Sequence, residues 1–190
     1  MSYGVKMLTK AQNRLLYLIS LYSKPSKSEN ENVIWIREMP LRVFMHEGIE
    51  RKIFDWDYAP ASVMLSDGRK FVNISQEGED DLNDLRELGL INALKLSTSR
   101  YYFITAYCIT EKGIEELNKI PLEDRQAVDS LVRCQCGGLL KTQEKDGSIK
   151  IKCGNCNYEK ESNILDVEDV SYVSKPYMPK QPNISKHRGV

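Results

Sequence analysis

Four cysteines in the last third of the chain restrict its fold more than any other feature of the sequence. They form two pairs, Cys134-x-Cys136 and Cys153-x-x-Cys156, with residues 137–152 between them. Two short pairs at this separation match the ligand spacing of a structural zinc ion, because each pair can occupy a tight turn and the turns can face each other. The sequence therefore predicts a structural Zn²⁺ site in which protein thiolates fill all four positions, leaving none for water or substrate.

A β-hairpin pattern fills the interval between the two pairs. Two leucines lead towards an Asp146-Gly147 turn signal, and isoleucines alternate with lysines on the way back to the second pair. With these features, residues 133–161 resemble a zinc ribbon, a small β module held together by a structural metal. The first pair encloses only Gln135, whereas most ribbons have two residues there, so its turn is expected to be tighter. Four unrelated thiols or a disulfide pair are the alternatives, and disulfides are rare inside cells.

The charge balance argues against a general attraction to nucleic acid. The 190 residues include 27 basic and 27 acidic side chains, which gives a formal net charge of zero. No apolar run approaches the roughly 18 residues of a membrane span, and the first residues lack a signal-like apolar run. We therefore expect an intracellular protein, in the cytoplasm or nucleus, with no membrane partner. The fifth cysteine, Cys108, lies in an apolar strand pattern and is predicted to be an inert core residue.

The first 74 residues predict helices and strands with unequal clarity. Thr9 and Gln12 form a capping-box pattern at the start of a helix that should run to about Ser23. A polar loop over residues 24–32 follows, then a strand pattern at 33–36 and a helical apolar spacing from Leu41 to Ile49. Residues 62–74 predict a hairpin around an Asp-Gly turn at 67–68.

Residues 75–120 carry sharper signals. Ser75 caps a helix that Gly89 should end as a left-handed residue, a hairpin pattern covers residues 93–109, and Thr110 caps a helix over 111–119. This order resembles the second half of a winged helix-turn-helix domain. The fold class expected from the sequence is thus α+β: a winged-helix-like domain over residues 1–120, then the ribbon and an extended C-terminal tail.

The helix over residues 76–88 would be the DNA-reading helix in such a domain, yet it is acidic. Six carboxylates surround a single basic residue, Arg86: Glu77, Glu79, Asp80, Asp81, Asp84 and Glu87. Because DNA affinity depends on cationic contacts with phosphates, readout of a base sequence by this helix is not expected. The carboxylates are either a solvated face or a dock for a basic protein partner.

Two further segments complete the predicted organisation. Residues 121–132 are expected to be a short linker. Residues 162–190 are expected to form an extended tail, in which Pro176, Pro179 and Pro182 recur with the three-residue period of a polyproline II helix. The tail is either disordered or becomes ordered on a partner protein.

Enzymatic activity is not expected from this sequence. The chain has only two histidines, His46 in an apolar stretch and His187 in the tail, and neither neighbours a motif for nucleophilic or acid–base chemistry. A Gly-rich phosphate loop is also missing from the sequence. We predict no catalytic residue, no small-molecule cofactor and no small-molecule substrate.

Two functions fit these features. The first is a non-catalytic, zinc-binding interaction or scaffold subunit of a larger assembly, which docks through its winged-helix domain and tail. The alternative follows from the domain order, which is similar to that of archaeal transcription factor E and the alpha subunit of transcription factor IIE. That resemblance implies contacts with RNA polymerase and promoter DNA. A zinc-dependent sensor, in which the tight Cys-x-Cys turn responds to oxidation or metal loss, is a third hypothesis.

Overall fold

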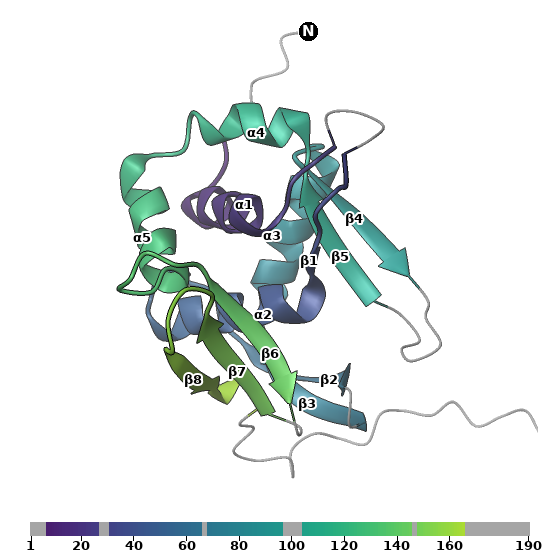
Figure 1. Ribbon diagram of the computed structural model, residues 1–190. Coiled ribbons are helices and arrows are strands. Elements are labelled where there is room, and N and C mark those ends of the chain that lie inside the picture. The colour runs from purple at the N-terminus through teal and green to yellow at the C-terminus, as the bar shows by residue number, and fades with distance from the viewer. Residues whose placement is uncertain (1–6, 27–30, 66–67, 97–103, 146–147, 166–190) are drawn as a thin grey trace, which may run out of the picture.

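The computed structural model (Figure 1) describes residues 7–26, 31–65, 68–96, 104–145 and 148–165, which form a mixed α+β structure. This fold class agrees with the sequence-based prediction. The elements follow in this order: α1 (Lys10–Tyr22), β1 (Ile36–Arg37), α2 (Glu38–Glu50), β2 (Ala59–Leu65), β3 (Gly68–Ile74), α3 (Gln76–Glu87), β4 (Ile91–Leu96), β5 (Ile104–Ile109), α4 (Glu111–Leu117), α5 (Leu122–Val132), β6 (Leu140–Lys145), β7 (Ser148–Cys153), β8 (Glu159–Ser162) and the 3-10 turn η1 (Asn163–Leu165).

Helix α1 lies at the centre of the structure, between α3, α4 and α5 (Figure 1). It begins with the predicted capping box: Thr9 Oγ1 accepts from the Gln12 amide, and Gln12 Oε1 accepts from the Thr9 amide, each at 3.1 Å. Leucines and an isoleucine along the helix are fully buried, including Leu15, Leu18 and Ile19. The local capping signal and the apolar spacing therefore place this helix in the core.

A three-stranded sheet in the order β1-β5-β4 packs beside the helices. The sequence predicts a strand at 33–36, but only Ile36 and Arg37 pair with β5, while Ile34 makes an isolated bridge with Lys24. The strand is short because α2 begins at Glu38. Pro40 occupies the first turn of α2, where an amide has no partner within the helix.

Helix α3 begins and ends as its sequence predicts. The Ser75 hydroxyl accepts from the Gly78 amide at 3.0 Å. At the other end Gly89 has φ +70°, the Leu90 amide donates to the Leu85 carbonyl, and the Gly89 amide donates to the Arg86 carbonyl, both at 2.9 Å. These two bonds are the Schellman pattern. The predicted hairpin before α3 is also present, as strands β2 and β3.

Residues 121–132 differ from the expected linker, because they form helix α5. Val128, Leu131 and Val132 are buried, and the helix packs against α1 and α2. These three positions have the i, i+3, i+4 spacing of an amphipathic helix. Burial against α1 therefore supplies the stability that an isolated helix of this length would lack.

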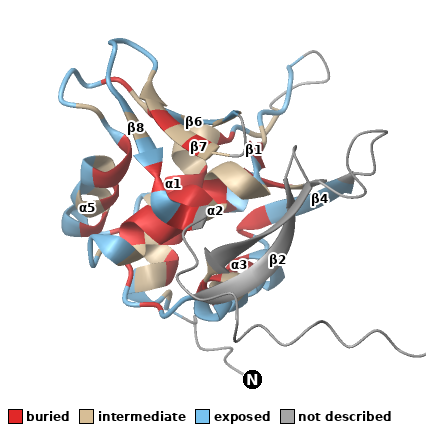
Figure 2. Ribbon diagram, turned by 90° about the horizontal axis from the view of Figure 1, so that it is seen from below, coloured by how far each residue is buried: buried red, intermediate tan, exposed pale blue. Residues whose placement is uncertain are grey.

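The ribbon sheet, in the order β6-β7-β8, shares one core with the helices. Leu140, Ile149 and Ile151 are buried together with the helical leucines. In Figure 2 the ribbon segments coloured as buried gather around α1 and α2. Ile164 of η1 is also fully buried, although it falls in the segment expected to be an extended tail. The predicted proline-spaced part of that tail lies outside the described residues.

Candidate metal centre

Two tight turns bring the four predicted cysteine ligands to one end of the ribbon. The first turn follows directly from α5: the Gly137 amide donates to the Cys134 carbonyl at 2.8 Å, and the Cys134 amide donates to the Gly138 carbonyl at 2.9 Å. The second turn joins β7 to β8, and there the Cys153 amide donates to the Tyr158 carbonyl at 3.0 Å. Main-chain hydrogen bonds therefore define the shape of both turns.

The four Sγ atoms form one compact cluster. All of them lie within 4.8 Å of one another; Cys134 Sγ is 3.6 Å from Cys156 Sγ, and Cys136 Sγ is 3.4 Å from Cys153 Sγ. Tetrahedral thiolates at about 2.3 Å from a zinc ion have sulfur–sulfur separations of about 3.8 Å. Disulfide sulfurs are about 2.05 Å apart, so these cysteines are free thiols. The cluster can hold one metal ion, and zinc is typical for four thiolates.

Glycines allow the two turns to approach each other. A Cβ on Gly138 would lie only 2.8 Å from the side chain of Asn155 in the facing turn. Gly137 has φ +82°, which a residue with a Cβ rarely adopts. Asn157, which directly follows the second cysteine pair, does not have a positive φ. The tighter first turn thus depends on Gly137 for its backbone and on Gly138 for space.

Neighbouring groups shift the pKa values of two of these thiols in opposite directions. The Asn155 amide, which donates to Cys153 Sγ at 3.3 Å, lowers the pKa of Cys153 to about 7, with help from neighbouring thiols. The Tyr158 amide lowers the pKa of Cys156, but the other three thiols outweigh it and raise that pKa to about 12. Metal binding must displace the proton that Cys156 retains.

Polar contacts also fasten β8 and η1 to helix α2. Lys160 of β8 forms an ion pair with the buried Glu47 of α2, whose other oxygen accepts from Ser162 Oγ at 3.3 Å. On the same helix, His46 Nε2 bonds Asn163 Oδ1 at 2.9 Å. These contacts are not predictable from the sequence, because the partners lie more than a hundred residues apart and no local pattern links them.

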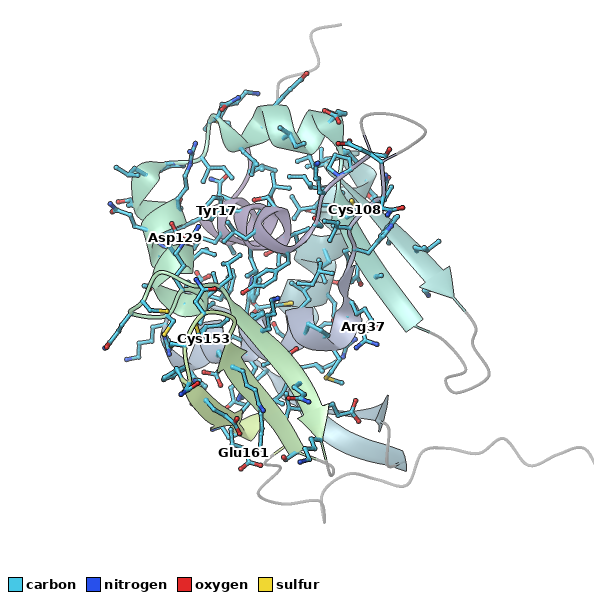
Figure 3. All side chains as sticks on the ribbon, viewed as in Figure 1. Tyr17, Arg37, Cys108, Asp129, Cys153 and Glu161 are labelled. Carbon is cyan, nitrogen blue, oxygen red and sulfur yellow. The ribbon has the colours of Figure 1, made fainter. Side chains whose placement is uncertain are left out.

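Cys108 lies well away from the cluster, on β5, whereas Cys153 lies at the α5 end of the ribbon (Figure 3). Cys108 is 2% exposed, and burial raises the pKa of its thiol. A buried thiol with a raised pKa is a poor nucleophile and a poor ligand. The structure therefore places Cys108 in the core, as predicted from the sequence.

Several carboxylates of α3 are engaged within the protein. Gln12 Nε2 donates to Asp81 at 2.9 Å and to Asp84 at 3.0 Å, and Trp56 Nε1 donates to Asp81 at 2.9 Å. The Glu79 carboxylate lies 3.1 Å from the Arg42 guanidinium. These acids therefore hold α3 against α1 and α2, which reduces the acidic face that a basic partner could contact.

The fold and the thiol cluster define a mixed α+β protein with a candidate four-cysteine metal centre. A family model described as the Uncharacterized protein MJ1567 family matches residues 11–171. Since this match covers most of the chain, the protein belongs to that family. No curated protein and no solved structure shows a significant match. Among the helices that the structure describes, none is long and apolar enough to cross a membrane.

Proposed function

We propose that this protein is a non-catalytic, zinc-binding subunit of a larger assembly and that it contacts its protein partners through a winged-helix-like domain. The observation that carries the proposal is the four-thiol cluster at the edge of the shared core, against which Cys134 and Cys153 pack. Cys134 lies two residues after the end of α5, and Cys153 ends β7, whose Ile149 and Ile151 are buried. A zinc ion with four thiolate ligands has no open position for substrate, so its role here is to hold the ribbon against the helices.

The element order supports the winged-helix part of the proposal. A helix, a short strand, two further helices and a β-hairpin follow each other as α1, β1, α2, α3 and β4-β5, and β1 pairs with β5. The β2-β3 hairpin is an addition between α2 and α3. Strand β4 is an edge of its sheet in the described structure, and Leu94 on it is 37% exposed. Exposed edges and apolar side chains are features that protein partners use.

The proposal is tested by capture from native extract, with the zinc-loaded full chain as bait. We expect one defined partner at fixed stoichiometry, measured by quantitative mass spectrometry of the eluate. A Leu94→Lys variant should lose part of the captured partner, whereas Lys10→Glu, an exposed substitution on α1, should not. The absence of any stoichiometric partner, with bait shown to be folded and zinc-loaded, would refute the scaffold role.

A second candidate, a protein that contacts nucleic acid as transcription factor E does, is favoured by the outer face of the ribbon sheet. Lys141 lies directly opposite Lys152, and Lys145 extends the same face. Glu159 compensates part of this charge, since it lies 2.6 Å from Lys150 and 2.9 Å from Lys152, contacts that lower the pKa of Glu159 to about 2. Like charges directly opposite each other destabilise a sheet. The repulsion between Lys141 and Lys152 would be offset if the two lysines bound a polyanion.

Binding to duplex DNA across a range of salt concentrations separates the two candidates. Sub-micromolar affinity with a steep salt dependence, reduced by Lys141→Glu but not by Lys10→Glu, would favour the nucleic-acid function. Weak binding that is equal in all three proteins would leave the scaffold function as the better explanation.

A further inference from the structure

A small pocket lies between α2, the end of β3 and the start of α3, apart from the thiol cluster. Arg42 and His46 of α2 line it together with Tyr58, Ser75 and Glu79. Its volume is about 10 Å³, close to the smallest space that admits one water-sized group. The pocket therefore accepts a single small polar group.

His46 presents a hydrogen-bond acceptor to this pocket. The residue is 3% exposed, and its Nε2 lies 2.9 Å from Asn163 Oδ1, which can only accept. In the neutral imidazole Nε2 must then carry the proton, which leaves a lone pair on Nδ1. Nδ1 is buried and has no hydrogen-bond partner in the described structure. Tyr58 packs edge-on against the ring, with centroids 5.4 Å apart, and so limits its rotation.

Arg42 presents a donor from the preceding turn of the same helix. Its terminal nitrogen lies 2.6 Å from Glu38 and 3.1 Å from Glu79. Its Nε is buried and without a hydrogen-bond partner among the described residues. Residues at i and i+4 share one face of a helix. Arg42 and His46 both line the pocket, and each has one buried nitrogen without a hydrogen-bond partner among the described residues: a donor at Arg42 Nε and an acceptor at His46 Nδ1.

The local charge selects a neutral ligand. Glu38 and Glu79 both surround the single guanidinium, and burial raises the pKa of Glu79 despite the opposing effect of Arg42. An anion would meet these carboxylates, and a cation would meet Arg42. The ligand must accept one hydrogen bond and donate at least one, and it must be no larger than one oxygen atom. A hydroxyl group meets both conditions.

We propose that this pocket is a binding site for a hydroxyl group, which accepts from Arg42 Nε–H and donates to His46 Nδ1. The hydroxyl comes from a bound water molecule or from a small alcohol that places one oxygen in the pocket. Because His46 also holds Asn163, the bound hydroxyl fixes the ring that anchors η1 to α2.

Nuclear magnetic resonance of the ¹⁵N-labelled full chain tests the site. Long-range ¹H–¹⁵N correlations should show His46 protonated at Nε2 and hydrogen-bonded at Nδ1, and Arg42 Hε should show a cross-peak to water. The variant His187→Ala identifies the ring signals, since the chain has only two histidines. Titration with glycerol shows whether the hydroxyl belongs to an alcohol or to water. Saturable chemical-shift changes at Arg42 Hε and His46 indicate an alcohol ligand. An unchanged cross-peak between Arg42 Hε and water indicates a bound water molecule.

A His46 ring protonated at Nδ1, or no water cross-peak and no saturable glycerol shift at Arg42 Hε, overturns the proposal. Arg42→Lys should abolish the hydrogen-bond shift at His46 Nδ1 while the Nε2–H signal persists. Arg37→Lys, at an exposed position of β1, is the matched control and should change neither signal. If Arg42→Lys fails to fold, the His46 tautomer and the Arg42 Hε cross-peak of the wild-type protein still test the proposal.

Discussion

The Tyr22 hydroxyl, at the end of α1, donates a hydrogen bond to the main-chain carbonyl of Leu140 at 2.6 Å. Tyr22 also stacks on Phe44 of α2, with ring centroids 5.1 Å apart, and burial raises the pKa of its phenol well above the ordinary range. Leu140 begins β6 and is itself buried. One phenol thus links the first helix of the chain to the first strand of the ribbon.

Replacing this tyrosine by Tyr22→Phe should destabilise the protein by about 1–3 kcal/mol, because the buried Leu140 carbonyl loses its side-chain donor while the ring stack remains. Urea unfolding measures the difference. Tyr17→Phe is the matched control. The Tyr17 hydroxyl donates to Asp129 at 3.3 Å from a less buried phenol, so the loss of stability should be smaller. Equal losses in the two variants would contradict the role given to Tyr22.

Helix α5 should behave as part of the core. Leu131 is 2% exposed and Leu122, on the same helix, is 68% exposed. Leu131→Ala should therefore cost about 2–5 kcal/mol, whereas Leu122→Ala should change the free energy of unfolding by about 0.5 kcal/mol or less. Thermal and urea unfolding of the two variants measure both values. A small effect of Leu131→Ala would mean that residues 121–132 act as a linker after all.

Local chemistry explains which elements the sequence predicts well. The capping box of Thr9 and Gln12, the Ser75 cap and the Gly89 stop each depend on residues within five positions of one another, so their signals are complete in a short window. The four metal ligands are predictable for the same reason, because each turn holds a pair. Such interactions need no knowledge of the rest of the fold.

Long-range burial explains what the sequence does not predict. Helix α5 has a short apolar pattern and gains its stability from α1, which lies about a hundred residues earlier in the chain. The Glu47 and Lys160 ion pair and the His46 and Asn163 bond join equally distant residues. A charged or polar residue in an apolar stretch shows that a partner is needed, but not which one.

The Glu47 and Lys160 pair should contribute to stability, because the Glu47 side chain is only 9% exposed. Lys160→Met leaves this carboxylate buried with Ser162 as its remaining hydrogen-bond donor, which should cost about 1–3 kcal/mol. Lys150→Met, on the exposed face of the same sheet, is the control and should be close to neutral. If both substitutions prove neutral in urea unfolding, the ion pair does not hold the ribbon in place.

Stability should fall at alkaline pH because of Tyr107. Burial, and then the charge of Glu79, raises the pKa of Tyr107 from 10.0 to about 12. The unfolded chain therefore releases this proton at lower pH than the folded protein. The contribution of the protonated Tyr107 to folding stability is complete below pH 10 and is lost between pH 10 and 12. A shift of two units corresponds to at most about 3 kcal/mol.

Urea unfolding at several pH values should show a shallower alkaline loss for Tyr107→Phe than for the wild type. Tyr158→Phe, at a position that is 42% exposed, is the control and should follow the wild-type curve. An identical slope for Tyr107→Phe and the wild type would assign the alkaline loss to other groups.

Metal removal should destabilise the whole chain, because Leu140, Ile149 and Ile151 of the ribbon belong to the same core as the helices. We expect one zinc ion per chain by elemental analysis, and a single cooperative thermal transition that moves to lower temperature after chelation. Zinc binding energies on the order of 10 kcal/mol in small peptides indicate how strongly metal binding can be coupled to folding.

Cys134→Ser should lose the metal and lower the melting temperature, whereas Cys108→Ala should keep the metal, since Cys108 lies in β5. Unchanged melting after verified metal loss would show that the main-chain bonds of the two turns hold the ribbon without zinc.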